Sequence, residues 1–317
     1  MRNRTGYITS GILADYRDNL NTNVNRVKCG ICGAYIEKGD GVKSSGYNGK
    51  FVHTACKARK VGYHCGSDSE IIGKQIAENF KVSPEWESML GNNRDGVLAA
   101  MEYMRTMGYS SESDGTVDIE WTGQQYNNMN GMAQVASKLH AFHRNGWIDT
   151  EPSNVGTHIN ISTDFIRNKR WSECKREIGD IAQKSVDVIV NNPRLSKICF
   201  GRSSGTWASD TVYNSYGFIH SSAINCQHTT EAKKADTRIE FRIMKFHSGY
   251  MTETENGANY YIAGVQIFKK WCKSLRVYYE KGWSADRIGD KLAKQLLKDM
   301  EKMASEASAE WIEWVTR

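Results

Sequence analysis

The stretch Arg238-Ile-Glu-Phe-Arg-Ile243 decides the fold class. Charged and apolar residues alternate strictly along it. An extended chain therefore places Arg238, Glu240 and Arg242 on one face and three apolar side chains on the other. This pattern predicts a β-strand with one face packed against a core. The chemistry of the charged face then has to be explained.

Three further stretches repeat this two-faced pattern. Their polar faces carry His158, Asn160 and Ser162 in residues 158–162, Asp118 and Glu120 in residues 116–122, and Asp68 and Glu70 in residues 66–70. For any one strand alone, an ordinary solvated face is the better explanation. Four such strands together favour one shared site. Carboxylates with an imidazole suit Mg2+ or Mn2+, and arginines suit phosphate oxygens.

The remaining periodicity predicts helices packed on such a sheet. Helical spacing of apolar residues covers 71–80, 94–108, 126–143, 171–191, 258–279 and 285–315. After residue 80 the expected strands, including those described above, cover 115–122, 155–162, 216–227 and 237–246. Strands mixed with helices in this order indicate an α+β fold with a largely antiparallel sheet and helices on its outer face. No stretch approaches the roughly 18 uninterrupted apolar residues of a membrane helix. The start also lacks the apolar core of a secretion signal, so we expect a cytoplasmic protein without a membrane partner.

Charge divides the chain into two parts. Residues 1–65 carry 11 Lys/Arg against 4 Asp/Glu, whereas the rest carries 31 against 32. Cysteines are uneven too, with four of the eight in the first 65 residues. We therefore expect an N-terminal arm and zinc module over residues 1–62 and a catalytic domain over residues 63–317.

The expected zinc ligands are Cys29, Cys32, His53 and Cys56. They form a C-x2-C…H-x2-C pattern, and each pair suits a tight turn that points two ligands at a tetrahedral Zn2+. A short hairpin between the pairs would deliver His53, and His64 or Cys65 could replace one ligand. A unit this small needs the metal for most of its folding energy. A structural role is favoured, while the excess of basic residues keeps a nucleic-acid contact open.

Several short motifs resemble those of amidoligases and glutamate–cysteine ligases. Gly156-Thr-His-Ile-Asn-Ile-Ser162 resembles their Gly-x-His-x-His-x-Ser strand, and Thr237-Arg-Ile-Glu-Phe-Arg242 resembles their Thr-x-Glu-Phe-Arg strand. The segments 200–208, 223–227 and 114–120 resemble further family segments in the same order. The zinc module resembles a treble-clef or LIM-type half-site. Many proteins of the amidoligase type are encoded by bacteriophages, which would fit the appended zinc module and would place the protein in the host cytoplasm.

The resemblance implies a glutamine-synthetase-like funnel that binds ATP and Mg2+ (or Mn2+). In it, a carboxylate is phosphorylated and an amine attacks the acyl phosphate to form an amide. Carried across, the metal ligands are Asp68, Glu70, Glu120, His158 and Glu240; Glu240, Arg242 and Arg202 are catalytic; and Asn225, Asn160 and Arg238 contact nucleotide or substrate. Asp114 and Asp118 are weaker candidates for the same acidic ring.

Two positions depart from the family pattern. The first strand of the family reads Gly-x-Glu-x-Glu, for which Asp68-Ser-Glu70 is the nearest match that we identify, and the second His of the His strand is replaced by Asn160. Two other functions stay open: a phosphotransferase on the same scaffold, and a nucleic-acid-binding zinc protein with a non-catalytic body. The identity of the carboxylate and of the amine, and the oligomeric state, are not encoded in any motif.

Overall fold

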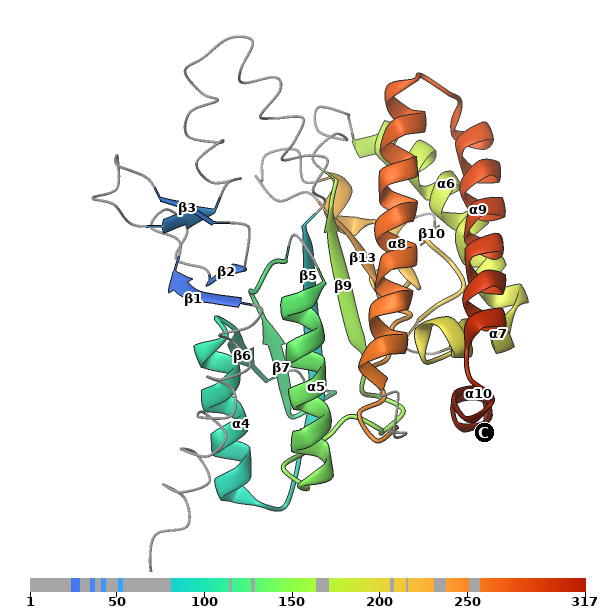
Figure 1. Ribbon diagram of the computed structural model, residues 1–317. Helices are drawn as coiled ribbons and strands as arrows, with labels where there is room; N and C mark the ends of the chain where they lie inside the picture. Colours follow the sequence, from blue (N-terminus) through green and yellow to red (C-terminus); the bar gives the residue numbers. More distant parts are fainter. Residues whose placement is uncertain are drawn as a thin grey trace, which may run out of the picture.

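The computed structural model (Figure 1) describes most of the chain after residue 80. The described ranges are 81–113, 116–126, 129–163, 171–205, 208–214, 216–230, 238–250 and 257–317, together with the backbone of four short strands before residue 54. Helices and an antiparallel sheet are mixed along the chain, which confirms the predicted α+β class. Among the described residues, no helix is both long and apolar enough to cross a membrane.

A seven-stranded sheet forms the centre of the molecule. Six strands follow the order β12-β13-β9-β5-β7-β6, and β8 pairs with one end of β5. These strands are β5 Val82–Leu90, β6 Ser110–Glu112, β7 Ile119–Thr122, β8 Ile148–Asp149, β9 Thr157–Ser162, β12 Ile224–Asn225 and β13 Arg238–Phe241. All of the strand pairs in this sheet are antiparallel.

The central strand β5 is one that the sequence analysis did not predict, and it contains Pro84. Val82 donates its backbone N–H to Tyr126 and accepts the Tyr126 N–H, so its backbone groups point away from β9. Because backbone groups alternate in direction along a strand, those of Pro84 point to the same side. On that side β7 pairs with β5 only from Trp86 onward. Pro84 therefore falls between two paired positions, where its missing N–H interrupts no ladder bond.

Helices cover the apolar face of the sheet, as expected (Figure 1). The described helices are α4 Arg94–Thr106, α5 Asn130–Arg144, α6 Trp171–Asn191, α7 Pro193–Phe200, α8 Gly257–Glu280, α9 Ala285–Glu306 and α10 Ala309–Thr316, of which α9 and α10 pack mainly on other helices. On α8, Phe268 stacks on Phe241 of β13 with ring centroids 4.1 Å apart, and Tyr261 lies 5.0 Å from Trp86 of β5. These buried aromatic contacts fix which face of each strand points away from the helices.

Several predicted boundaries are wrong. The expected strand over 237–246 is regular only over Arg238–Phe241. The expected helix over 71–80 lies outside the described residues. The expected helix over 285–315 is two helices, because Ala307 is extended and the Ser308 side chain accepts from the Trp311 N–H to begin α10. The expected strand over 216–227 is two short strands, β11 Gly217–Phe218 and β12, and β11 pairs with β10 Tyr213–Asn214. The expected strand over 115–122 is regular only from Ile119.

Four short strands are described near the N-terminus. β1 Val24–Lys28 pairs with β2 Tyr35–Glu37, and β3 Gly41–Lys43 pairs with β4 Phe51–His53. A hairpin ending at His53 is thus present, as predicted. The side chain of His53 and the residues Cys29, Cys32 and Cys56 lie outside the described part, so the zinc site stays a prediction.

Candidate active site

The register of the sheet gathers polar side chains from neighbouring strands on the face opposite the helices. Asn225 on β12 pairs with Glu240 on β13, which pairs with Asn160 on β9. One step along, His158 on β9 pairs with Glu85 on β5. Because side chains alternate along each strand, all five point to the same face.

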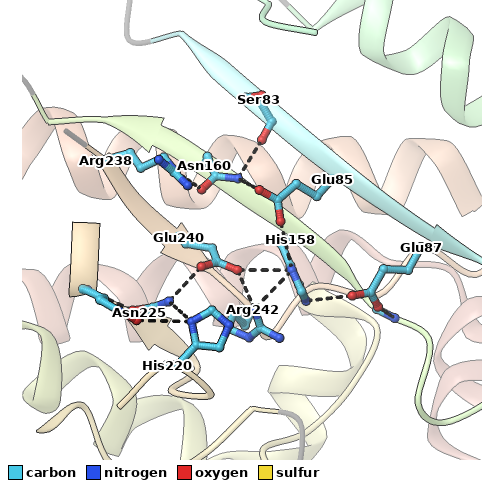
Figure 2. A network of polar contacts seen from close by, with 12 residues as sticks. Ser83, Glu85, Glu87, His158, Asn160, His220, Asn225, Arg238, Glu240 and Arg242 are labelled. Atoms are coloured by element: carbon cyan, nitrogen blue, oxygen red, sulfur yellow. Dashed lines mark hydrogen bonds and ion pairs between the residues drawn. The ribbon is translucent and has the colours of Figure 1, made fainter. Parts of the chain in front are cut away.

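Glu85, His158 and Glu240 form the only cluster of potential metal ligands found among the described residues. His158 Nδ1 lies 3.2 Å from Glu85 Oε2 and 3.1 Å from Glu240 Oε1 (Figure 2). Neighbouring ligands of an octahedral metal about 2.1 Å away are separated by about 3 Å. These two separations are compatible with ligands of one divalent cation, and the three potential ligand atoms lie within 4.8 Å of one another.

Glu87 occupies the other side of the same imidazole. Its Oε1 lies 3.3 Å from His158 Nε2, and its second oxygen accepts the backbone N–H of Gly156. Glu87 is buried, with 6% of its surface exposed. A carboxylate that accepts from one ring nitrogen fixes the tautomer and turns the other nitrogen toward a metal. Glu87 therefore orients His158, with Nδ1 facing Glu85 and Glu240.

Two amide side chains extend this network. Asn160 donates to Glu85 Oε1 at 2.8 Å and accepts from Arg238 Nε at 2.8 Å. Asn225 is fully buried and donates to Glu240 Oε2 at 2.8 Å. Both amides hold carboxylates of the cluster in place, and the nucleotide or substrate contact expected from the sequence stays a prediction.

Cationic groups lie beside the carboxylates. Arg242 Nη1 is 2.7 Å from Glu240 Oε1 and 3.3 Å from His158 Nδ1. Arg202 follows the end of α7 and donates to the backbone carbonyl of Arg242. The Nε atoms of Arg202 and Arg242 are both buried without a hydrogen-bond partner. This leaves donor capacity for an anionic ligand.

Burial and charge shift the pKa values of three of these groups. Burial would lower the pKa of His158, but its hydrogen bond to Glu85 and the charges of Glu240 and Glu87 raise it above its usual value. Burial would raise the pKa of Glu85, but hydrogen bonds from His158 and Asn160 and nearby positive charges lower it to about 2. Burial lowers the pKa of Arg202 to about 10, against the attraction of Glu87. The cluster thus carries close-packed charges of both signs.

The structure places the predicted residues unevenly. Glu240, His158, Asn160, Asn225, Arg238, Arg242 and Arg202 converge on one region. Glu120 pairs with Glu87 across β5 and β7 but is outside the metal-type cluster. Asp118 accepts from the backbone N–H of Leu90 at 2.8 Å, away from that cluster. Asp68, Glu70 and Asp114 lie outside the described residues.

Four polar residues near these groups were not predicted from the sequence: Glu85, Glu87, His220 and Lys245. Glu85-Trp-Glu87 has the Glu-x-Glu spacing that we sought at residues 68–70, and the alternation of Val82 and Trp86 with these acids is the signal that could have found it. His220 Nδ1 lies 3.4 Å from Asn225 Nδ2. Lys245 donates to the carbonyls of Glu151 and Pro152 at 2.7 Å each, and burial lowers its pKa to about 8.

No protein-family model matches the chain, and no curated protein matches it. The geometry of the cluster therefore carries the functional argument.

Proposed function

We propose that the protein is an ATP-dependent carboxylate–amine ligase whose site lies on the polar face of the sheet. One observation carries the proposal: Glu85, His158 and Glu240 present three potential ligand atoms within 4.8 Å of one another, next to Arg242. Triphosphate chemistry needs a divalent cation and a positive group at the transferring phosphoryl. Both requirements can be met here by residues of different strands.

The residues of this chain divide the work between them. Glu85, His158 and Glu240 would hold Mg2+ or Mn2+, which would neutralise phosphate oxygens when bound. Glu87 keeps the imidazole in the tautomer that such binding needs. Arg242 and Arg202 would stabilise negative charge on the transferring group because their guanidinium donors suit phosphate oxygens.

The proposed reaction has two steps because a carboxylate is a poor electrophile. A carboxylate resists attack by an amine, so its oxygen first attacks the γ-phosphoryl of ATP and ADP leaves. The amine then attacks the carbonyl carbon of the acyl phosphate, loses a proton, and inorganic phosphate leaves. The polar face of the sheet would form the wall of a glutamine-synthetase-like funnel that keeps water from the acyl phosphate. The motifs quoted above support this choice over a phosphotransferase. We also retain the zinc module and the cytoplasmic location as part of the proposal.

The test begins with binding and proceeds to turnover. Calorimetry should show Mn2+ binding to the wild type and a loss of at least about 100-fold in affinity in Glu240→Gln, since a direct ligand is removed. ADP and phosphate release should then require Mg2+, a carboxylate and an amine, and mass spectrometry should find the amide. Glu112→Gln on the exposed edge strand β6 is the matched control and should leave both unchanged.

Two results would contradict the proposal. If the wild type binds neither Mn2+ nor MgATP, the cluster is a structural ion-pair network. If ATP is consumed and a stable phosphorylated small molecule accumulates without an amide, the protein is a phosphotransferase.

A further inference from the structure

A basic ridge follows the solvent side of α9, far along the chain from the site described above. It consists of Arg287, Lys291, Lys294, Lys298 and Lys302, all exposed. At 100° per residue these five side chains fall within about 80° of the helix circumference. The rise of 1.5 Å per residue makes the ridge about 22 Å long. We call these five residues the α9 ridge.

Three acidic residues of the same helix form ion pairs with lysines of other helices. Asp286 and Asp290 pair with Lys184 of α6, and Asp299 pairs with Lys270 of α8 at 2.6 Å. The opposite side of α9 is apolar and buried, with Ile288, Leu292, Leu296 and Met300 in the core. Positive charge is thereby segregated onto the outward side of a helix whose acids and bases would otherwise balance.

Few acids compensate the ridge itself, although Asp290, which pairs with Lys184, also lies close enough to Lys294 to attract its charge. Lys302 has a long contact of 3.7 Å with Glu306, in which both side chains are largely exposed, and Glu301 lies at one edge. Exposed pairs of this kind contribute little energy. Lys291 and Lys298 have no ion pair among the described residues. The cations of the ridge are therefore available to a partner.

Aromatic rings lie at the N-terminal end of the ridge. Arg287 stacks on Trp283 with 3.8 Å between its guanidinium carbon and the ring centroid. Trp283 in turn stacks on Tyr278 at 4.6 Å with nearly parallel planes. This stack holds Arg287 in place, which lowers the entropy cost of presenting its charge.

We propose that the α9 ridge binds the phosphodiester backbone of a nucleic acid. Duplex DNA carries one negative charge per about 1.7 Å of its axis, so a 22 Å ridge spans about a dozen phosphates. An anionic membrane is a poorer match, since interfacial helices insert apolar side chains. None of the exposed large hydrophobic residues described in the structure is on α9. This inference is independent of the proposed ligase activity and of the zinc module.

The experiment compares two triple variants of the full chain. Lys291→Gln/Lys294→Gln/Lys298→Gln removes the middle of the ridge and keeps helix-forming residues. Arg94→Gln/Arg105→Gln/Arg144→Gln removes the same charge from α4 and α5, which lie on the other side of the molecule (Figure 1). Fluorescence anisotropy measures binding of labelled duplex DNA, single-stranded DNA and duplex RNA between about 50 and 200 mM KCl, where counterion release is readily measured.

We expect the ridge variant to bind at least about tenfold more weakly at 100 mM KCl. The slope of log Kd against log salt should fall by about three, roughly one for each lost phosphate contact. The α4/α5 control should stay within about twofold of the wild type. The relative affinity for the three probes identifies which nucleic acid fits. Thermal melts of both variants establish that they are folded.

The proposal is overturned if the wild type binds none of the probes at about 50 mM KCl, where such binding is strongest. It is also overturned if the ridge variant binds as well as the wild type, because binding then belongs to another surface such as the basic residues before position 66. Equal losses in both triple variants would show a non-specific charge effect. Binding of phosphatidylserine vesicles without binding of any nucleic acid would assign the ridge to a lipid surface instead.

Discussion

At the residue scale, the two nitrogens of His158 have different partners. Nδ1 faces Glu85 and Glu240, whereas Nε2 faces Glu87. We therefore expect Glu87→Gln to weaken Mn2+ binding by about 10- to 100-fold, the usual effect of losing a carboxylate behind a histidine ligand. Calorimetry at pH 7 measures this affinity.

A merely structural role for Glu87 would give a different result. The Gln side chain can still accept the Gly156 N–H, so folding should be largely preserved, and a thermal melt checks this. If Mn2+ affinity is unchanged while the melting temperature falls, Glu87 serves packing and does not orient His158.

The sequence predicts which face of a strand a polar residue occupies, but it predicts only some of the side-chain contacts that the residue makes. Alternation in residues 238–241 was enough to place Arg238 and Glu240 on one face, because a strand has a period of two. Arg242 follows the strand in a turn, and its 2.7 Å contact with Glu240 was not given by that rule. No such rule links Asn225 to Glu240 or Glu87 to the Gly156 N–H. Those contacts depend on strand order and register, which come from long-range packing.

At the element scale, the end of α7 sets the position of Arg202. Gly201 closes this helix with φ of 83°, and a Cβ there would lie 2.3 Å from the carbonyl oxygen of Lys245. Gly201→Ala should therefore lower the free energy of unfolding by about 3 kcal/mol or more, from left-handed strain plus a backbone clash. Urea unfolding measures the loss.

Gly282 provides the matched control. It has φ of 68°, but a Cβ added there would meet nothing within 4 Å. Gly282→Ala should cost only about 1 kcal/mol, the strain of the backbone alone. Equal costs at the two positions would show that the contact with Lys245 does not limit the turn before Arg202.

Helices were easier to predict than strands for a physical reason. The helix over residues 171–191 was predicted with the boundaries that the structure shows, since its apolar stripe is long and repeated. Strand β5 escaped because Pro84 breaks the expected pattern and its acids look solvated. Pro84 is tolerated because it lies between the position paired with Tyr126 and the positions paired with β7, where no backbone N–H is needed. Those pairings involve distant residues and cannot be read from the local sequence.

At the scale of the whole molecule, Glu151 connects segments that are distant in the sequence. Its carboxylate accepts from His247 at 2.8 Å and from the Gly249 N–H at 2.8 Å. His247 also contacts the Gly201 carbonyl and packs edge-on against Trp314 of α10, with ring centroids 4.8 Å apart. The C-terminal helix is thus joined to the turn that carries Arg202.

Because of this connection, the free energy of unfolding should depend on pH in the acidic range. Burial would raise the pKa of Glu151, but His247, the Gly249 N–H and the charge of Lys245 lower it below its usual value of 4.5. A lowered carboxylate pKa stabilises the fold above pH 4.5, and this stabilisation is lost as the pH falls through the folded-state pKa. We expect Glu151→Gln to lose about 1–3 kcal/mol at pH 6, and less as the pH approaches 3.

Urea unfolding of both proteins across this pH range tests the expectation. The curves of stability against pH should converge in acid, because the wild-type carboxyl group is then neutral like the amide. A constant difference at all pH values would mean that the substitution acts through packing and not through charge.

Arg242 has a consequence for the order of events at the site. Its guanidinium pairs with Glu240 Oε1, the same oxygen that the proposed function assigns to a divalent cation, so the guanidinium and such a cation would compete for it. The site would then have two alternative states, one closed by the protein's own guanidinium and one occupied by a metal ion. An Arg242 side chain released from Glu240 would be available to donate to a phosphate oxygen of the nucleotide.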